Sequence, residues 1–106
     1  MNKEMFQNER YITRGIKENV SPYYYLFLWK LIDDMVNEEK DYLQVFRLRN
    51  RLSVLDGVSL IEVEHSQEDP SYKQIHKFFS YVPVVDTKVI AIDDGQNSIM
   101  FLSDEC

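Results

Sequence analysis

Residues 21–38 read SPYYYLFLWKLIDDMVNE, and they carry the strongest helix signal in the chain. Ser21 is a preferred N-cap residue, and Pro22 suits the first helical position, where a missing N–H group costs nothing. The first half of the stretch is apolar all the way round, whereas polar residues gather on one side only from Lys30 onward. We therefore predict one long helix over about residues 22–38.

This helix has more apolar surface than a single stripe accounts for. Side chains spaced by three and four positions form the predicted core stripe: Tyr25, Leu28, Trp29, Ile32, Met35 and Val36. Tyr23, Leu26 and Phe27 fall on the opposite, otherwise polar face. Two explanations stay open, because either the N-terminal arm or a loop covers these three side chains, or they contact a partner. They are the candidate partner-binding residues.

The rest of the chain alternates in the manner of β-strands. A weak strand signal covers residues 10–16, and stronger signals cover residues 41–48, 58–65, 75–82, 87–93 and 98–103. Both faces of residues 75–82 are apolar, which predicts a strand that is covered on both sides or lies centrally in the sheet. Asp94-Gly95 predicts a tight hairpin, and Leu60-Ile61 breaks the alternation, which predicts a bulge.

This order of elements predicts an α+β fold in which residues 1–106 form a single domain. We expect the helix to pack on an antiparallel sheet of about five to six strands joined by hairpins. The predicted contact between the layers joins Leu28, Trp29, Ile32 and Met35 of the helix to Phe46, Phe79 and Ile90 or Ile92 of the sheet.

The net charge of −6 is unevenly distributed along the chain. Residues 1–53 hold nine Lys and Arg against eight Asp and Glu, whereas residues 54–106 hold three against ten, so the halves carry about +1 and −7. A broad acidic surface favours solubility or a basic partner and disfavours nucleic acid. No apolar run is long enough for a membrane span, and residues 1–10 are too polar for a secretory signal, so we expect a cytoplasmic protein without a membrane partner.

The chain carries no signature of catalysis or of a cofactor. His65 and His76 are the only histidines, no serine lies in a Gly-x-Ser-x-Gly turn, and the three glycines are isolated. We therefore expect no enzyme, no cofactor and no small-molecule substrate. Residues 93–98 resemble a calcium loop in composition but lack the EF-hand pattern, so no metal site is predicted. Cys106 is the only cysteine and can close no internal disulfide.

A row of arginines is the main basic feature. Arg47, Arg49 and Arg51 alternate, so on one strand they would stand about 7 Å apart, close to the spacing of nucleic-acid phosphates. Arg10 and Arg14 could join them. The alternative interpretation is a charged strand that forms ion pairs with glutamates of a neighbouring strand.

Several stretches, taken together and in order, resemble a small bacterial and phage family known as domain of unknown function 960. They are residues 10–16 (RYITRGI), 28–33 (LWKLID), 41–46 (DYLQVF), 65–73 (HSQEDPSYK) and 88–95 (KVIAIDDG). The C-terminal end departs from the family pattern, with Ser103 and Cys106 in place of an alanine and an aromatic residue. The resemblance implies a bacterial, phage or mobile-element setting, and it implies no activity, substrate or cofactor.

These observations favour a non-enzymatic interaction module that binds a protein partner or a second copy of itself. The alternative is a nucleic-acid-associated accessory protein that uses Arg47, Arg49 and Arg51.

Overall fold

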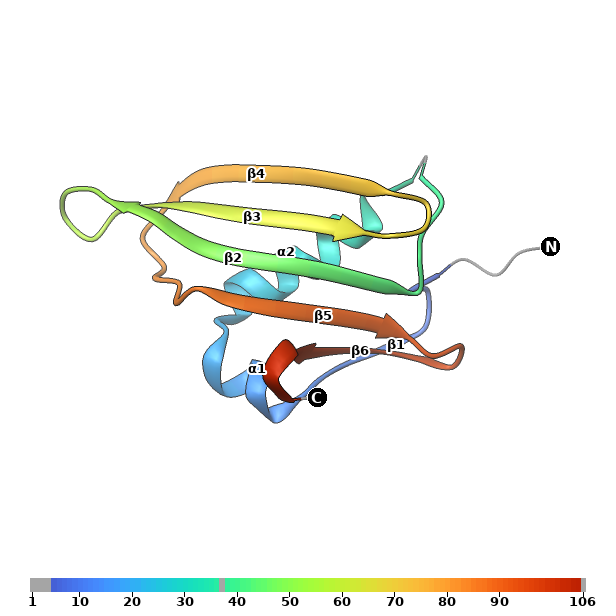
Figure 1. The fold of residues 1–106 in the computed structure, drawn as a ribbon. Coiled ribbons are helices and arrows are strands. Elements are labelled where there is room, and N and C mark those ends of the chain that lie inside the picture. The colour runs from blue at the N-terminus through green and yellow to red at the C-terminus, as the bar shows by residue number, and fades with distance from the viewer. Residues whose placement is uncertain (1–4, 37, 106) are drawn as a thin grey trace.

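The structure is a computed structural model that describes residues 5–36 and 38–105. Within these residues, six strands form one sheet in the order β1-β6-β5-β2-β3-β4 (Figure 1). The strands are β1 (Glu9–Ile12), β2 (Leu43–Ser53), β3 (Ser59–Gln67), β4 (Tyr72–Ser80), β5 (Thr87–Asp93) and β6 (Asn97–Leu102). The α+β class is therefore confirmed, and every strand predicted after the helix is present with its ends shifted by a few residues.

The sheet is mixed, and the prediction of a fully antiparallel sheet was wrong. β2, β3, β4, β5 and β6 pair in antiparallel fashion, whereas β1 runs parallel to β6 and places Glu9 opposite Asn97. The backbone amide of Thr13 extends this pairing by donating to the Met100 carbonyl at 3.1 Å. Because the two strands come from opposite ends of the chain, no local pattern could reveal their relative direction.

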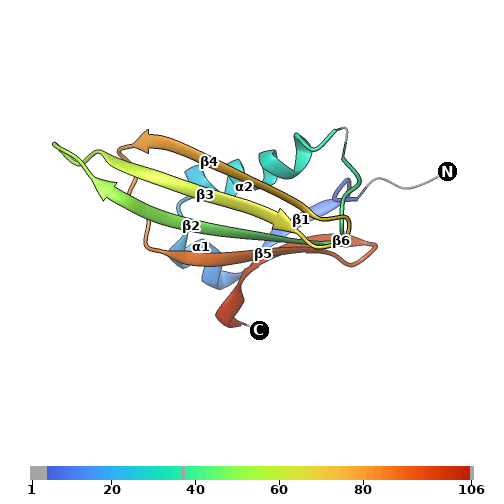
Figure 2. The same ribbon diagram turned by 45° about the horizontal axis from the view of Figure 1, so that its top comes forward.

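Two helices, rather than one long helix, cover one face of the sheet (Figure 1 and Figure 2). The longer, α2, spans Pro22–Asp33, and the Ser21 side chain caps it as predicted by accepting a hydrogen bond from the Tyr23 amide. The predicted end near residue 38 was wrong. The Met35 amide donates to the Ile32 carbonyl, only three residues back, and the chain then turns towards β2, which leaves Val36 exposed. Asn37, inside the predicted helix, lies outside the described residues. No helix in the described part of the chain is long and apolar enough to cross a membrane.

The shorter helix, α1 (Arg14–Asn19), replaces the second half of the strand predicted over residues 10–16. A short 3-10 helix, η1 (Ser103–Glu105), holds its first turn in place. The Glu105 carboxylate accepts hydrogen bonds from Thr13 Oγ1 at 2.7 Å, the Gly15 amide at 3.0 Å and the Leu102 amide at 2.7 Å. A Cβ atom on Gly15 would lie 2.3 Å from the carboxylate carbon, so this close contact requires glycine. Cys106 lies outside the described residues.

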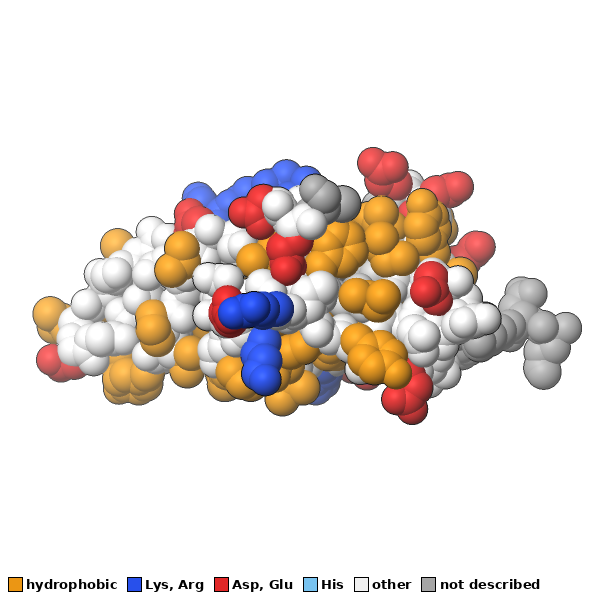
Figure 3. Space-filling view, turned by 90° about the horizontal axis from the view of Figure 1, so that it is seen from below, with side chains coloured by type: hydrophobic (Ala, Val, Ile, Leu, Met, Phe, Trp, Pro, Cys, Tyr) orange, Lys and Arg blue, Asp and Glu red, His pale blue; other side chains and the backbone are white. Residues whose placement is uncertain are grey.

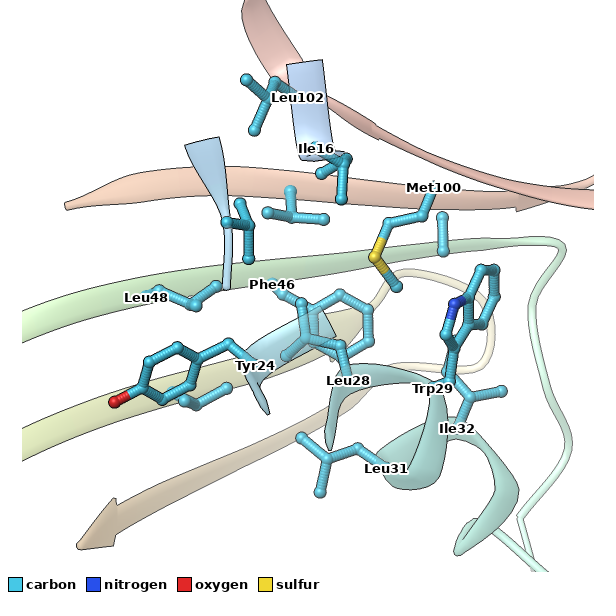
Figure 4. Packing of buried hydrophobic residues seen from close by; sticks show 14 of the residues in the cluster. Ile16, Tyr24, Leu28, Trp29, Leu31, Ile32, Phe46, Leu48, Met100 and Leu102 are labelled. Carbon is cyan, nitrogen blue, oxygen red and sulfur yellow. The ribbon is translucent and has the colours of Figure 1, made fainter. Parts of the chain in front are cut away.

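The core lies between α2 and one face of the sheet, where α2 side chains meet Phe46, Leu48 and Met100 (Figure 4). Leu28, Trp29, Ile32 and Met35 are buried as predicted, and so is Phe46. The other predicted sheet contacts were wrong, because Phe79, Ile90 and Ile92 stand one register position away and point to the opposite face. Phe78, Val89 and Ala91 take their places. A shift of one residue moves a strand side chain to the other face, so the sequence pattern had to be exact to identify these partners.

β2 continues past the end of β5 while still paired with β3, and the end of this β2–β3 ribbon, where the two strands are joined, projects from the molecule (Figure 1). The predicted bulge is present, but it lies in β2 between Asn50 and Leu52 rather than in β3 at Leu60-Ile61. The ribbon helps to make the molecule elongated, with principal extents of 51 × 29 × 19 Å.

Candidate protein-binding site

β4 forms one edge of the sheet, which overturns the prediction that residues 75–82 are covered on both sides. Within the described residues its only strand neighbour is β3. Ile75 and Phe79 point to the face without helices and are 49% and 66% exposed. The apolar pattern on both faces of β4 therefore belongs to an open edge rather than to a central strand.

The helix residues predicted to contact a partner lie next to this edge. Tyr23 and Leu26 are 56% and 60% exposed, whereas Phe27 is half-buried and packs edge to face on Phe78 of β4, with ring centroids 5.5 Å apart. The described part of the N-terminal arm packs elsewhere, because Phe6 is buried against Trp29 on the far side of α2. Two of the three predicted side chains thus face solvent, and the third connects the helix to the strand.

Between helix and strand lies a groove of about 430 Å³, which we call the α2–β4 groove. It is lined by Tyr23, Leu26, Phe27, Lys30, Phe78 and Phe79. Five of these side chains are apolar or aromatic, and the sixth, Lys30, places its Nζ 3.0 Å from Asp34 of the next helical turn. The lining therefore offers apolar contact area and a charged rim, which are the usual components of a protein-binding surface.

The arginine row is largely paired with glutamates. Nη1 of Arg49 lies 3.0 Å from Glu62 and 3.5 Å from Glu64 of β3, and Nε of Arg51 lies 3.6 Å from Glu62. The bulge in β2 takes Arg51 out of the alternation that placed it in line with Arg49. Arg47 is exposed, and its position in the β2–β5 register is opposite Lys88. The geometry matches the ion-pair interpretation of this row.

Arg10 and Arg14 do not join the row, which corrects that suggestion from the sequence. Arg10 lies near the other edge of the sheet, where its guanidinium binds both carboxylate oxygens of Asp33 and lies 4.9 Å from the centre of the Trp29 ring. Arg14 pairs with Glu18 within α1 at 2.7 Å. Figure 3 shows the molecule from the β1–β6 side, where hydrophobic side chains gather at one end among acidic ones.

A buried polar network, which the sequence analysis missed, lies under the helix-covered face. His65 Nε2 and Gln44 Oε1 are 2.7 Å apart, and the Gln44 amide donates to Gln67 Oε1 at 2.6 Å. Burial lowers the pKa of His65 from 6.5 to about 4, and the nearby His76 contributes to the shift. Its Nδ1 is buried without a hydrogen-bond partner in the described part of the chain. One signal was present in the sequence, because Gln44 occupies an inward position between the apolar residues of β2.

The Asp94-Gly95 hairpin is confirmed, with φ of +97° at Gly95. Its two carboxylates bind the protein's own groups. Asp93 accepts hydrogen bonds from the Phe6 amide at 2.7 Å and the Gly95 amide at 2.8 Å. The Asn97 and Gln96 amides donate to Asp94 and hold the pKa of its carboxyl below the usual value. These carboxylates thus close the turn and anchor the start of the chain.

Comparison with known proteins identifies the family to which the chain belongs. A crystal structure of a protein of unknown function from Enterococcus faecalis matches it with a TM-score of 0.80 and 24% sequence identity, covering 99% of this chain and 98% of the other. This likeness establishes the fold alone. A search of curated proteins finds no match. The family model described as "Staphylococcal protein of unknown function (DUF960)" matches residues 9–105, so the chain belongs to the domain-of-unknown-function family 960.

Proposed function

We propose that this protein is a non-enzymatic interaction module that binds a protein partner through the α2–β4 groove. One observation carries the proposal: Tyr23, Leu26 and Phe79, all more than half exposed, gather around an open apolar groove. Clustered apolar area of this kind on an otherwise polar helix face is typical of interaction sites. A bacterial or phage setting and a cytoplasmic location belong to the same proposal.

The shape of the site supports contact with another protein more than chemistry. Phe27 and Phe78 contact each other edge to face in the lining of the groove, and the ring of Tyr23 packs edge to face on the buried Tyr24, with ring centroids 5.0 Å apart. Aromatic rings that are already ordered lose little conformational entropy when a partner binds. The groove is thus preorganised for an apolar side chain of the partner.

Affinity capture with matched variants tests this proposal. The site variant combines Tyr23→Ser with Leu26→Ser, and the control combines Tyr11→Ser with Leu52→Ser, which are 51% and 58% exposed at other places. Both variants should keep the melting temperature of the wild type, since surface substitutions change stability little. We expect a bacterial protein that the wild type and the control capture in equal amounts and that the site variant does not capture.

Capture of the same proteins by all three forms would contradict the proposal. A second copy of the chain is the other occupant to test, by light scattering of the wild type and the site variant over a range of concentrations. If the wild type forms a dimer and the site variant does not, the groove binds a second copy of the chain rather than a foreign protein.

A further inference from the structure

We infer that the partner supplies an extended segment with acidic side chains at alternate positions, which binds as an added strand on the free edge of β4. This inference rests on the proposed function, because the added strand would occupy the α2–β4 groove. It specifies how the partner binds and which chemistry the protein recognises.

The geometry of β4 suits an added strand. β4 is nine residues long and ends the sheet, and an edge strand presents a row of backbone N–H and C=O groups to its outer side. A strand placed there would turn alternate side chains to the two faces of the sheet. One set would enter the α2–β4 groove against Phe27 and Phe78, and the other would lie beside Ile75 and Phe79.

The charge of β4 indicates the character of the second set. Lys73 and Lys77 flank Ile75 on the face without helices, and β4 contains no Asp or Glu. Lys77 has no ion-pair partner among the described residues, and Nζ of Lys73 lies 3.9 Å from Glu64. In a chain with a net charge of −6, β4 itself thus carries only positive charge, and Glu62 of β3 stands opposite Lys77 in the register. Carboxylates on the added strand would lie opposite these ammonium groups.

A second copy of the chain fits this edge less well than an acidic segment. Two β4 strands side by side would place four lysines on one face, with no carboxylate on either strand to compensate them. Opposite charge therefore favours a foreign segment over β4–β4 pairing. Lysines on an edge strand also prevent unwanted pairing in many proteins, and the experiment separates that role from recognition.

The probe is the peptide Glu-Ile-Glu-Phe-Glu-Ile-Glu-amide with a fluorescein group on its N-terminus, which presents glutamates on one face and apolar side chains on the other. Its control is the same peptide with lysine at every glutamate position. Fluorescence anisotropy should show binding of the acidic peptide, and the affinity of the lysine peptide should be at least about tenfold lower. The double variant Lys73→Glu, Lys77→Glu should reverse this order. Lys73→Gln with Lys77→Gln, which adds no repulsion to Glu62 or Glu64, should give intermediate affinities.

Hydrogen exchange measured by NMR on the full chain distinguishes an added strand from simple docking in the groove. We expect the acidic peptide to slow exchange at alternate backbone amides of β4, because only those amides point outward. Binding that leaves the β4 amides unchanged would overturn the added strand. Equal binding of the two peptides would overturn the charge preference.

Failure of this inference and failure of the proposed function give different results. If neither peptide binds while Tyr23→Ser with Leu26→Ser still abolishes partner capture, the groove binds a protein by another mode, and the lysines serve only to protect the edge. If that variant captures the same proteins as the control, the proposed function itself is wrong.

Discussion

The two edges of the sheet differ in almost every respect. β1 is a strand of four residues, held by the ion pair between Arg10 and Asp33 and by the hydrogen bond that the Phe6 amide, just before the strand, donates to Asp93. β4 is a strand of nine residues whose outer side has no strand neighbour in the described part of the chain. Beside β1 lies a hollow whose lining includes the ion-paired Arg10 and Asp33 together with Trp29, whereas the groove beside β4 is lined mostly by apolar and aromatic side chains.

This difference shows how a small domain can separate stability from binding. Polar contacts that join distant parts of the chain lie near β1, where they fix both termini to the sheet. Near β4, by contrast, Tyr23, Leu26 and Phe79 are each more than half exposed and line the α2–β4 groove. Substitutions near β1 should therefore alter folding, and substitutions on the outer side of β4 should alter recognition.

Trp29→Ala should produce the largest loss of stability. A small loss would contradict the contrast drawn between the two edges of the sheet. Trp29 is 6% exposed, contacts Phe6 and lies under the Arg10 guanidinium. Removing a buried ring of this size should cost about 3–5 kcal/mol of unfolding free energy, measured by urea denaturation. Leu26→Ala is the matched control on the β4 side of the same helix, and it should change stability by less than about 0.5 kcal/mol. Similar losses in both variants would refute the division between the edges.

His65, which lies on the β4 side of the core, should make the free energy of unfolding depend on pH. The unfolded chain takes up a proton on this histidine below pH 6.5, whereas the folded chain resists protonation until about pH 4, because burial lowers the pKa. The stabilisation is thus complete above pH 6.5 and is lost as pH falls from 6.5 to about 4. A shift of this size corresponds to about 3 kcal/mol.

Thermal unfolding of two variants measures this dependence. His65→Gln should flatten the fall in stability between pH 6.5 and 4, while His76→Gln should keep most of it, since burial is a larger cause of the lowered His65 pKa than the nearby His76. If His76→Gln flattened the curve as much as His65→Gln, another part of the molecule would be responsible.

A double-mutant cycle at Gly15 and Glu105, measured by the free energy of unfolding, tests how the C-terminal end of the chain constrains α1 on the β1 side. In the wild type, the Cβ of Gly15→Ala would displace the Glu105 carboxylate and break its hydrogen bonds, so the variant should gain nothing from the better helix former. In a Glu105→Ala background the space is free, and Gly15→Ala should stabilise the protein by up to about 1 kcal/mol. The same effect of Gly15→Ala in both backgrounds would show that Glu105 does not constrain this helix.

The smallest effect is expected for the arginines of β2, in the middle of the sheet, when oligonucleotide binding is measured. The triple variant Arg47→Ala, Arg49→Ala, Arg51→Ala should bind labelled oligonucleotides no differently from the wild type, and neither should bind at micromolar concentration near physiological salt. Glu62 and Glu64 already compensate two of these arginines, and the chain as a whole is acidic. Micromolar binding that the triple variant loses would make nucleic-acid association the better hypothesis.

Local signals in the sequence were reliable where neighbouring residues determine the structure. Ser21 and Pro22 marked the start of α2, and Asp94-Gly95 marked a hairpin with positive φ at the glycine. Helical periodicity also placed Tyr23 and Leu26 on the polar face of the helix, although it left open whether another part of the chain covers them. Each of these features depends on residues within one or two turns of each other.

The features that the sequence did not reveal depend on distant contacts. Residues 14–19 contain the β-former Ile16 and a glycine, yet they form a helix whose Gly15 amide donates a hydrogen bond to Glu105 from the other end of the chain. The direction of β1 and the position of β4 at an edge are likewise set by the order of strands, which alternation does not encode. For the same reason the groove could not be predicted, because two of its six lining residues, Phe78 and Phe79, come from the strand that was expected to be covered.

The projecting β2–β3 ribbon offers a practical handle on the molecule. Its tip, residues 54–57, is exposed, and none of these residues lines the α2–β4 groove. Exposed loop tips of this kind tolerate insertions and attached groups. A dye or surface linker joined at Leu55 would thus hold the protein by a point remote from β1 and outside the groove, leaving the open edge of β4 accessible to whatever is brought to it.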